Sequence, residues 1–132
     1  MKIALLGING SGLDKNETQE AIYKIIEIVN RYDDPTILTI HSPNGGINLL
    51  VELYADSNEK KKQYYNYGKS IYDWKESSQQ LAEDCDVFFC LTTKIKKHKC
   101  HHCLDYTHER TGACYPMKLA KKMGKQTKLI IL

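Results

Sequence analysis

The sequence has no long hydrophobic run, and this absence sets the first limit on its class. A membrane-spanning helix needs roughly 18 or more consecutive apolar residues, and no stretch of the chain approaches that length, so we expect no membrane insertion. The apolar stretch at residues 1–7 is shorter than the roughly 7–15 residues of a secretory h-region. It therefore predicts a first strand and a cytoplasmic protein.

The sequence also lacks a strong excess of one charge and an even number of cysteines. The formal net charge is +3 and comes from scattered lysines, which leaves nucleic acid open as a partner without favouring it. Five cysteines cannot all pair with one another. Without an export signal, this count indicates reduced thiols and a metal site more than a disulfide framework.

The chain does contain an alternation of apolar, strand-like runs with segments of helical period, which is typical of parallel β-α-β units. We predict a single three-layer, Rossmann-like α/β domain over residues 1–132, with a central, mostly parallel sheet of about five strands. The first helix is expected to begin near Asn16, capped by that side chain together with Gln19. The expected strands are residues 3–6, 36–40, 86–91 and 127–132, and the polar residues 57–70 are expected to form a mobile excursion.

Sheets of this kind bind ligands beyond the carboxyl ends of their strands, where the following helices begin. Three loops occupy such positions, at residues 7–12, 44–46 and 111–112. Glycines in the first loop let backbone amides approach a phosphate or ribose, although they suit a tight turn equally well. The second loop opens a helix, so its free N–H groups would form an anion site. The candidate ligand-binding residues are Gly7, Asn9, Gly10, Ser11, Gly12, Asn44, Gly45, Gly46, Thr92, Thr111 and Gly112.

Several short motifs follow one another in an informative order. A glycine-serine loop with a downstream acid lies at residues 10–14, a Gly-Gly turn at 45–46, and an aspartate before a strand at Asp86. A Thr-Gly pair at 111–112 opens a helix that closes with A-x-x-x-G-K at 120–125. Over nearly the whole chain this order resembles the SLOG superfamily, the DprA-like, LOG-like and YpsA-like Rossmann-type nucleotide-binding proteins. The resemblance implies a nucleotide or nucleoside-derived ligand, bound by a sensor or by an N-glycoside-cleaving enzyme of the phosphoribohydrolase or deoxyribosyltransferase kind.

The catalytic motif of that superfamily is incomplete in this chain. LOG-type hydrolases carry P-G-G-x-G-T-x-x-E, whereas residues 111–118 lack both the Gly-Gly pair and the glutamate. A glycosidase needs a carboxylate to stabilise its oxocarbenium-like transition state or to activate water, and Lys118 can do neither. Glu52 is the remaining candidate catalytic residue, although a solvated helix residue is its plainer interpretation. Enzyme activity is left open, while ligand binding does not depend on the missing glutamate.

The most distinctive local pattern is a run of cysteines and histidines between residues 98 and 114. Cys100 and Cys103 form a zinc-type C-x-x-C pair, because two thiolates on a tight turn can reach one ion at about 2.3 Å. His108 and Cys114 complete a set near the spacing of a zinc knuckle, and His98 and His102 are alternates. We predict a zinc-binding insert at about residues 93–114, with a structural zinc and no redox cofactor. An open site would indicate metal-assisted hydrolysis instead, and a surface loop with free thiols would need no metal.

Two classes of function remain open. The preferred ligand is a small nucleotide or nucleoside derivative. The alternative is a nucleic-acid-binding module that uses the zinc-supported loop and residues 60–67, where lysines and tyrosines supply charge and stacking surface. Binding that weakens steeply with salt would favour nucleic acid, and a bounded stoichiometry would favour the small ligand. A homo-oligomer is compatible with either class.

Overall fold

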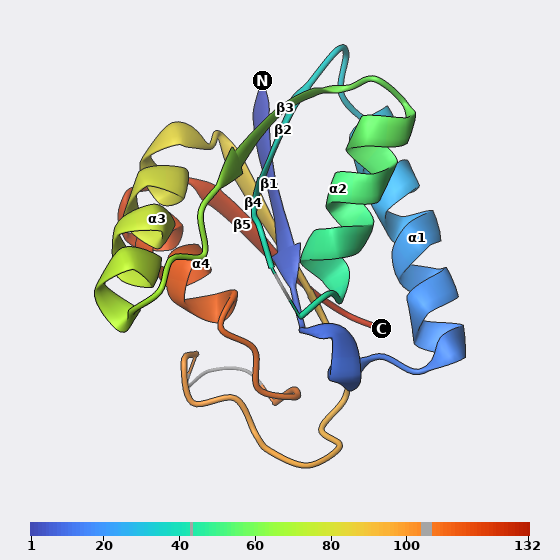
Figure 1. Ribbon diagram of the computed structural model, residues 1–132, viewed down its shortest axis with the longest axis vertical. Helices are drawn as coiled ribbons and strands as arrows, with labels where there is room; N and C mark the ends of the chain where they lie inside the picture. Colours follow the sequence, from blue (N-terminus) through green and yellow to red (C-terminus); the bar gives the residue numbers. More distant parts are fainter. Residues whose placement is uncertain (43, 104–106) are drawn as a thin grey trace.

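A parallel sheet forms the centre of the molecule (Figure 1), in a computed structural model that describes residues 1–42, 44–103 and 107–132. The five strands that the described residues form lie in the order β3-β2-β1-β4-β5, and every pairing between them is parallel. The two central strands, β1 and β4, are buried almost throughout, because helices cover both of their faces. This confirms the predicted α/β class. The strands are β1 (Lys2–Gly7), β2 (Thr36–Ile40), β3 (Lys61–Tyr65), β4 (Val87–Thr92) and β5 (Gln126–Ile131).

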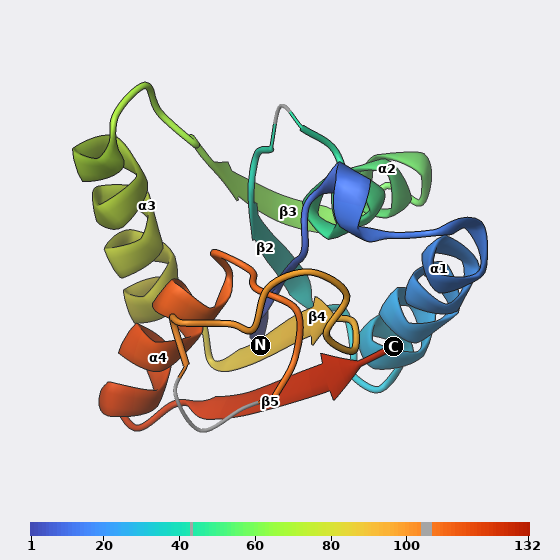
Figure 2. The same cartoon turned by 90° about the horizontal axis from the view of Figure 1, so that it is seen from below.

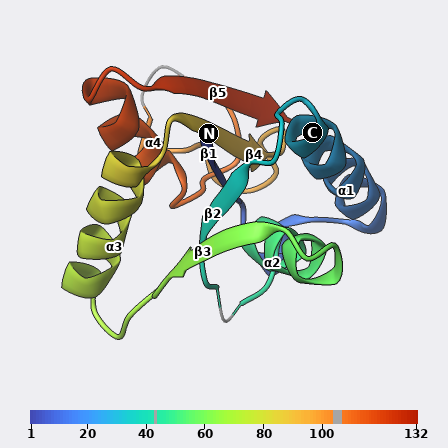
Figure 3. The same ribbon diagram turned by 90° about the horizontal axis from the view of Figure 1, so that it is seen from above.

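In the described part of the chain, four helices complete the three layers. The helices α1 (Lys15–Asn30) and α2 (Ile47–Ser57) cover one face of the sheet, and α3 (Ile71–Asp84) and α4 (Cys114–Lys122) cover the other (Figure 3). Each face has its own hydrophobic core, because alternate residues of every strand point in opposite directions. The chain also forms a short 3-10 turn, η1 (Gly10–Gly12), directly after β1. No helix in the described ranges is long and apolar enough to cross a membrane.

The first helix begins earlier than the sequence predicted. Asp14, and not Asn16, is the N-cap of α1: its carboxylate accepts the amide of Glu17 at 2.8 Å, and the Glu17 carboxylate accepts the amide of Asp14 at 3.0 Å. Asp14 and Glu17 stand three apart just as Asn16 and Gln19 do, so both pairs fit the capping-box pattern. The two carboxylates also interact favourably with the positive end of the helix, which favours the earlier start.

The region expected to be an excursion contains the edge strand β3. Only one side of β3 pairs, with β2, and its first three residues are exposed, so the strand lacks the apolar alternation that signals a sheet. Lys61 pairs with Asp34 at 2.5 Å and Lys62 with Asp56 at 2.6 Å. Tyr65 is buried and its hydroxyl donates to Asp84 on α3 at 2.5 Å. The expectation of a mobile segment was therefore wrong for Lys61–Tyr65.

The sheet order brings strands from distant parts of the chain together. After β3 the chain returns through α3 to place β4 beside β1, so the connections that leave β1 and β4 run to opposite faces. Between β4 and α4, the described residues 93–103 and 107–113 form an insert at the carboxyl edge of the sheet, which Figure 2 shows from below. Asn48 on α2 braces this edge from within: it accepts the amide of Gly7 at 3.0 Å and donates to the Ile40 carbonyl at 2.8 Å.

Candidate metal centre and ligand cavity

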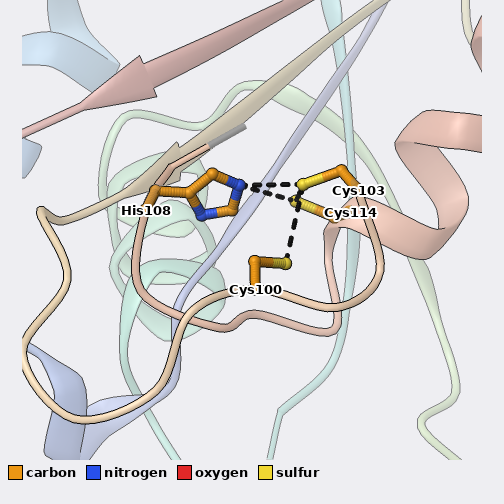
Figure 4. Close-up of side chains that lie close together, drawn as sticks. All are labelled: Cys100, Cys103, His108 and Cys114. Atoms are coloured by element: carbon orange, nitrogen blue, oxygen red, sulfur yellow. Dashed lines mark hydrogen bonds between the residues drawn. The ribbon is translucent and has the colours of Figure 1, made fainter. Parts of the chain in front are cut away.

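Four side chains of the insert and α4 converge on one point (Figure 4). They are Cys100, Cys103, His108 and Cys114, and one ligand atom from each lies within 4.8 Å of all the others. All four residues are buried, and none of the cysteines forms a disulfide. These are the four residues that were predicted from the sequence as the preferred metal ligands. The alternates lie elsewhere, since His98 is exposed and His102 stacks against other rings.

The distances between the four donor atoms suit one tetrahedral ion. The Cys103 sulfur lies 2.8 Å from His108 Nε2, 3.2 Å from the Cys114 sulfur and 3.5 Å from the Cys100 sulfur. Zinc–sulfur bonds of about 2.3 Å and zinc–nitrogen bonds of about 2.0 Å would place such donors roughly 3.5–3.8 Å apart. An ion therefore requires only small outward movements of the side chains. The cluster is able to hold a metal ion with a Cys3His ligand set.

The orientation of His108 suits a metal ligand. Its Nδ1 lies 2.8 Å from the Glu109 carbonyl oxygen, which can only accept a hydrogen bond. The proton of a neutral ring is therefore on Nδ1, and Nε2 presents its lone pair to the three sulfurs. A hydrogen bond of this kind to the far nitrogen is the usual arrangement of a metal-bound histidine, because it fixes the tautomer and the ring plane.

The pKa values of the three cysteine thiols in the cluster depend on their burial and on the groups beside them. Burial opposes ionisation of Cys100, but neighbouring backbone groups of Thr111 and His102 offset it and leave the pKa of Cys100 below its ordinary value. Burial, followed by the adjacent thiols, raises the pKa of Cys103. The thiol of Cys90 and then burial raise the pKa of Cys114. Three thiolates this close would be stable together only beside a cation, which would supply the opposite charge.

Residues 98–100 pair antiparallel with residues 108–110, and this pairing, here called the hairpin, holds the metal ligands in place. The amide of Cys100 donates to the His108 carbonyl at 3.0 Å, and the amide of Arg110 donates to the His98 carbonyl at 2.8 Å. The carboxylate of Glu109 accepts the amides of Lys97, Lys96 and His98, at 2.7, 2.8 and 3.1 Å. These hydrogen bonds, of which that from Lys97 is strongest, lower the pKa of Glu109 to about 2. Glu109 thus links residues 96–98, near the start of the insert, to the end of the insert.

A cavity of about 500 Å³ lies beside the insert, at the carboxyl ends of β1 and β2. The predicted ligand-binding residues Gly7, Asn9 and Gly112 contribute to its wall, and His102 closes it on the side of the insert. The other wall comes from the start of α3 and the segment before it. The lining residues there are Tyr67, Gly68, Lys69, Ser70, Ile71 and Trp74.

Sequence reasoning missed the aromatic wall of this cavity. Trp74 lies 5.0 Å from Tyr115 and 6.3 Å from His102 between ring centroids, so three rings from α3, α4 and the insert form one cluster. A β-carbon at Gly112 would lie 3.3 Å from the Trp74 ring, a tight contact that would require the ring to shift slightly. The available signal was that Trp74 is the only tryptophan of the chain, in a segment that opens a helix.

Gly46 and Gly10 have a packing role that could not be predicted from the sequence. A β-carbon on Gly46 would lie 2.3 Å from the Ile8 carbonyl oxygen, and one on Gly10 would lie 2.3 Å from the Asn44 carbonyl oxygen. The amide of Ile47 donates to the Ile8 carbonyl at 2.9 Å. The amide of Ile47 at this helix start is therefore not free, because the loop after β1 already accepts its proton.

The remaining predicted residues lie around the cavity or behind it. Ser11 is part of η1, and Asn44 is exposed. Gly12 and Thr111 line a second, neighbouring cavity. Thr92 is fully buried and its hydroxyl donates to the Glu109 carbonyl at 3.1 Å. Glu52 lies on α2 outside the described cavity linings, with its carboxylate 2.9 Å from Nδ1 of the exposed His41.

Comparison with family models, curated proteins and solved structures returns no match for this chain. The fold and the site therefore define its class by themselves: it is a Rossmann-like α/β domain whose β4–α4 insert carries a buried Cys3His cluster able to hold a metal ion.

Proposed function

We propose that this protein binds a nucleotide or a nucleoside-derived ligand in the cavity beside β1 and β2, and that a structural zinc ion in the Cys3His cluster holds the wall of that cavity. The observation that carries the proposal is the position of the cavity. It lies at the carboxyl edge of a parallel sheet, next to the point where the strand order reverses between β1 and β4. Open α/β sheets bind their ligands in such crevices.

The lining of the cavity supports a ligand with a flat ring and polar substituents. Trp74 and Tyr67 offer aromatic surface, while Asn9 and Lys69 offer polar groups. The Ser42 hydroxyl is buried and has no hydrogen-bond partner among the described residues, although Ser42 is part of the lining. A buried hydroxyl of this kind is costly unless a partner is provided. A nucleoside combines stacking surface with such partners.

The proposed zinc has a structural role. Its four protein ligands would complete a tetrahedral shell, which leaves no open position for water or substrate. The segment that they hold continues through Thr111 and Gly112 into α4, and Gly112 and Ala113 line the cavity. The metal would thus fix one wall of the binding site.

Binding without cleavage is the function that we favour. No carboxylate is among the residues described as lining this cavity, and hydrolysis of an N-glycoside needs one. The resemblance to SLOG proteins supports the ligand class more than the reaction. A sensor or carrier of a nucleotide-type molecule fits both observations.

The nucleic-acid alternative has less support. The tyrosines of β3 are turned to intramolecular partners, since Tyr64 donates to Asp56 at 2.8 Å and Tyr65 donates to Asp84. Lys61 and Lys62 are likewise paired with carboxylates. These groups would first have to release their partners before they could stack on bases or bind phosphates.

Trp74 provides a direct test, because it is the only tryptophan and lies in the cavity wall. We would titrate the purified protein with the four common ribonucleosides and their 5′-monophosphates and follow Trp74 fluorescence. At least one should quench it saturably with one-to-one stoichiometry. Tyr67→Ala should weaken that binding about tenfold, since base stacking on an aromatic ring contributes about 1–3 kcal/mol.

Tyr72→Ala is the matched control. Tyr72 is 80% exposed and lies on the same segment outside the lining, so its removal should leave the affinity unchanged. Unaltered fluorescence up to millimolar concentrations of every compound would overturn the proposal. Salt-sensitive binding of an oligonucleotide without any binding of the monomers would favour the nucleic-acid alternative.

A further inference from the structure

A second cavity, of about 320 Å³, adjoins the first. The two cavities share Asn9, His102 and Gly112 in their walls, so they form two compartments of one cleft. The first, here called the aromatic compartment, is lined by Tyr67 and Trp74. The second, here called the basic compartment, is lined by Lys96, Lys97, His98 and Arg110 together with Ile8, Gly12, Glu109 and Thr111.

Two charged side chains of the basic compartment already have partners within the chain. Lys96 donates to the Gly12 carbonyl at 2.9 Å and forms an ion pair with Glu17. The carboxylate of Glu109 is held by the three backbone amides described above. The Glu17 carboxylate therefore neutralises Lys96. Glu109 keeps its negative charge, but its oxygens are occupied by these amides, which belong to the insert itself.

Lys97 and Arg110 are in a different situation. Both side chains are exposed, both residues line the compartment, and neither has a carboxylate partner among the described residues. Their backbones are nevertheless fixed, because the amide of Lys97 donates to Glu109 and that of Arg110 donates to His98. Two cations that have no internal partner but sit on an ordered hairpin are suited to an external anion.

We infer that the basic compartment binds the phosphate group of a nucleotide whose base and ribose occupy the aromatic compartment. This inference rests on the proposed function and narrows it to phosphorylated ligands. A 5′-phosphate is joined to its nucleoside by one bond, so a single molecule can fill two compartments that share three wall residues. The phosphate site belongs to the insert, and the same segment carries Cys100 and His108 of the metal cluster.

The test compares each ribonucleoside with its own 5′-monophosphate by Trp74 fluorescence at fixed ionic strength. The wild-type protein should bind the monophosphate about a hundredfold more tightly, about tenfold for each of the two cations. Lys97→Ala and Arg110→Ala should each weaken monophosphate binding about tenfold, because hydrogen bonds to charged groups contribute about 1.5–3 kcal/mol. Neither substitution should change the affinity for the nucleoside, and the double variant should bind both forms about equally.

Lys99→Ala is the matched control, since it removes the same charge from the same hairpin at an exposed position outside the lining. It should leave the preference for the monophosphate intact. Equal affinity of the wild type for nucleoside and monophosphate would overturn the phosphate site alone and leave the proposed function standing. An effect of Lys99→Ala as large as that of Arg110→Ala would also overturn it, because it would show general charge attraction. Binding of neither form would instead overturn the proposed function.

Discussion

Among single residues, Gly46 and Gly124 form a matched pair for substitution by alanine. Both have a positive φ, of 80° and 81°, and the ψ of −151° at Gly46 places that residue in a region open essentially to glycine alone. A β-carbon on Gly46 would meet three backbone atoms at 2.3–2.6 Å, whereas one on Gly124 would meet nothing within 4 Å. Gly124→Ala should therefore lower the free energy of unfolding by only the cost of the left-handed conformation, about 1–2 kcal/mol.

Gly46→Ala should cost more, about 3 kcal/mol or above, because the overlap with the loop after β1 adds to the conformational strain. Urea denaturation of both variants measures the difference. Equal losses of unfolding free energy would mean that the loop after β1 moves aside at no cost in stability. The Gly-Gly turn at residues 45–46 would then be available for ligand binding.

The metal ligands allow a second prediction at this scale. Cys103→Ser should lose most of the bound zinc, because Cys103 has the shortest contacts within the cluster and three ligands do not close the shell. Cys85→Ser should retain about one equivalent, since Cys85 is equally buried but lies outside the cluster. Elemental analysis of protein purified without chelator decides the matter. Less than about a tenth of an equivalent in the wild type would contradict a structural zinc.

The sequence was informative about residues wherever chemistry depends on local spacing. The four metal ligands lie within 15 positions, and the structure places them together. Residues whose role depends on distant partners were not predictable in this way. Asn48 joins the ends of β1 and β2, and Trp74 meets Tyr115 and His102, only because the sheet order brings those segments into contact.

Among elements, the insert should respond most to metal removal. The amides of Cys100 and Arg110 donate within the hairpin, and that of Glu109 donates to the carbonyl of Thr93, directly after β4. After chelation these amides should exchange faster with deuterium, because the cluster no longer joins the hairpin to α4. Amides of β1 and β4 should exchange as before, because they pair in the centre of the sheet. Unchanged protection of the insert would show that Glu109 and the hairpin hold it without metal.

The elements divide into those with a strong pattern and those without one. Strands β1, β2 and β4 are apolar and were predictable, because both faces of a central parallel strand are buried. The edge strand β3 carries the letters K-K-Q-Y-Y, and three of its five residues are exposed. The position of β3 is determined by its pairing with β2 in the folded protein, and its own sequence gives no indication of that pairing.

At the scale of the whole molecule, the metal cluster belongs to only one of the two cores. Cys100, Cys103 and Cys114 pack with the residues beneath α3 and α4, whereas the core beneath α1 and α2 contains none of the ligands. The metal-free protein should therefore stay folded and unfold at a lower temperature. The Tm should rise with free zinc concentration, by the equivalent of about 2.7 kcal/mol at a hundred times the Kd. Calorimetry at buffered zinc concentrations measures this, and a Tm independent of zinc would contradict the site.

The architecture itself was the most predictable feature, because the alternation of strands and helices restricts the topology to few choices. The strand order was not predicted, because no local sequence pattern indicates that β4 pairs with β1.

The pairing of β1 with β4 has a consequence for synthesis on the ribosome. Lys2 and Asp86, which are hydrogen-bonded at the start of the two strands, are 84 positions apart. At about 5–20 residues per second, the nascent chain waits roughly 4–17 s between making β1 and making its neighbour. Throughout that interval one edge of β1 is exposed, so the growing chain is most open to wrong strand pairing before its last third exists.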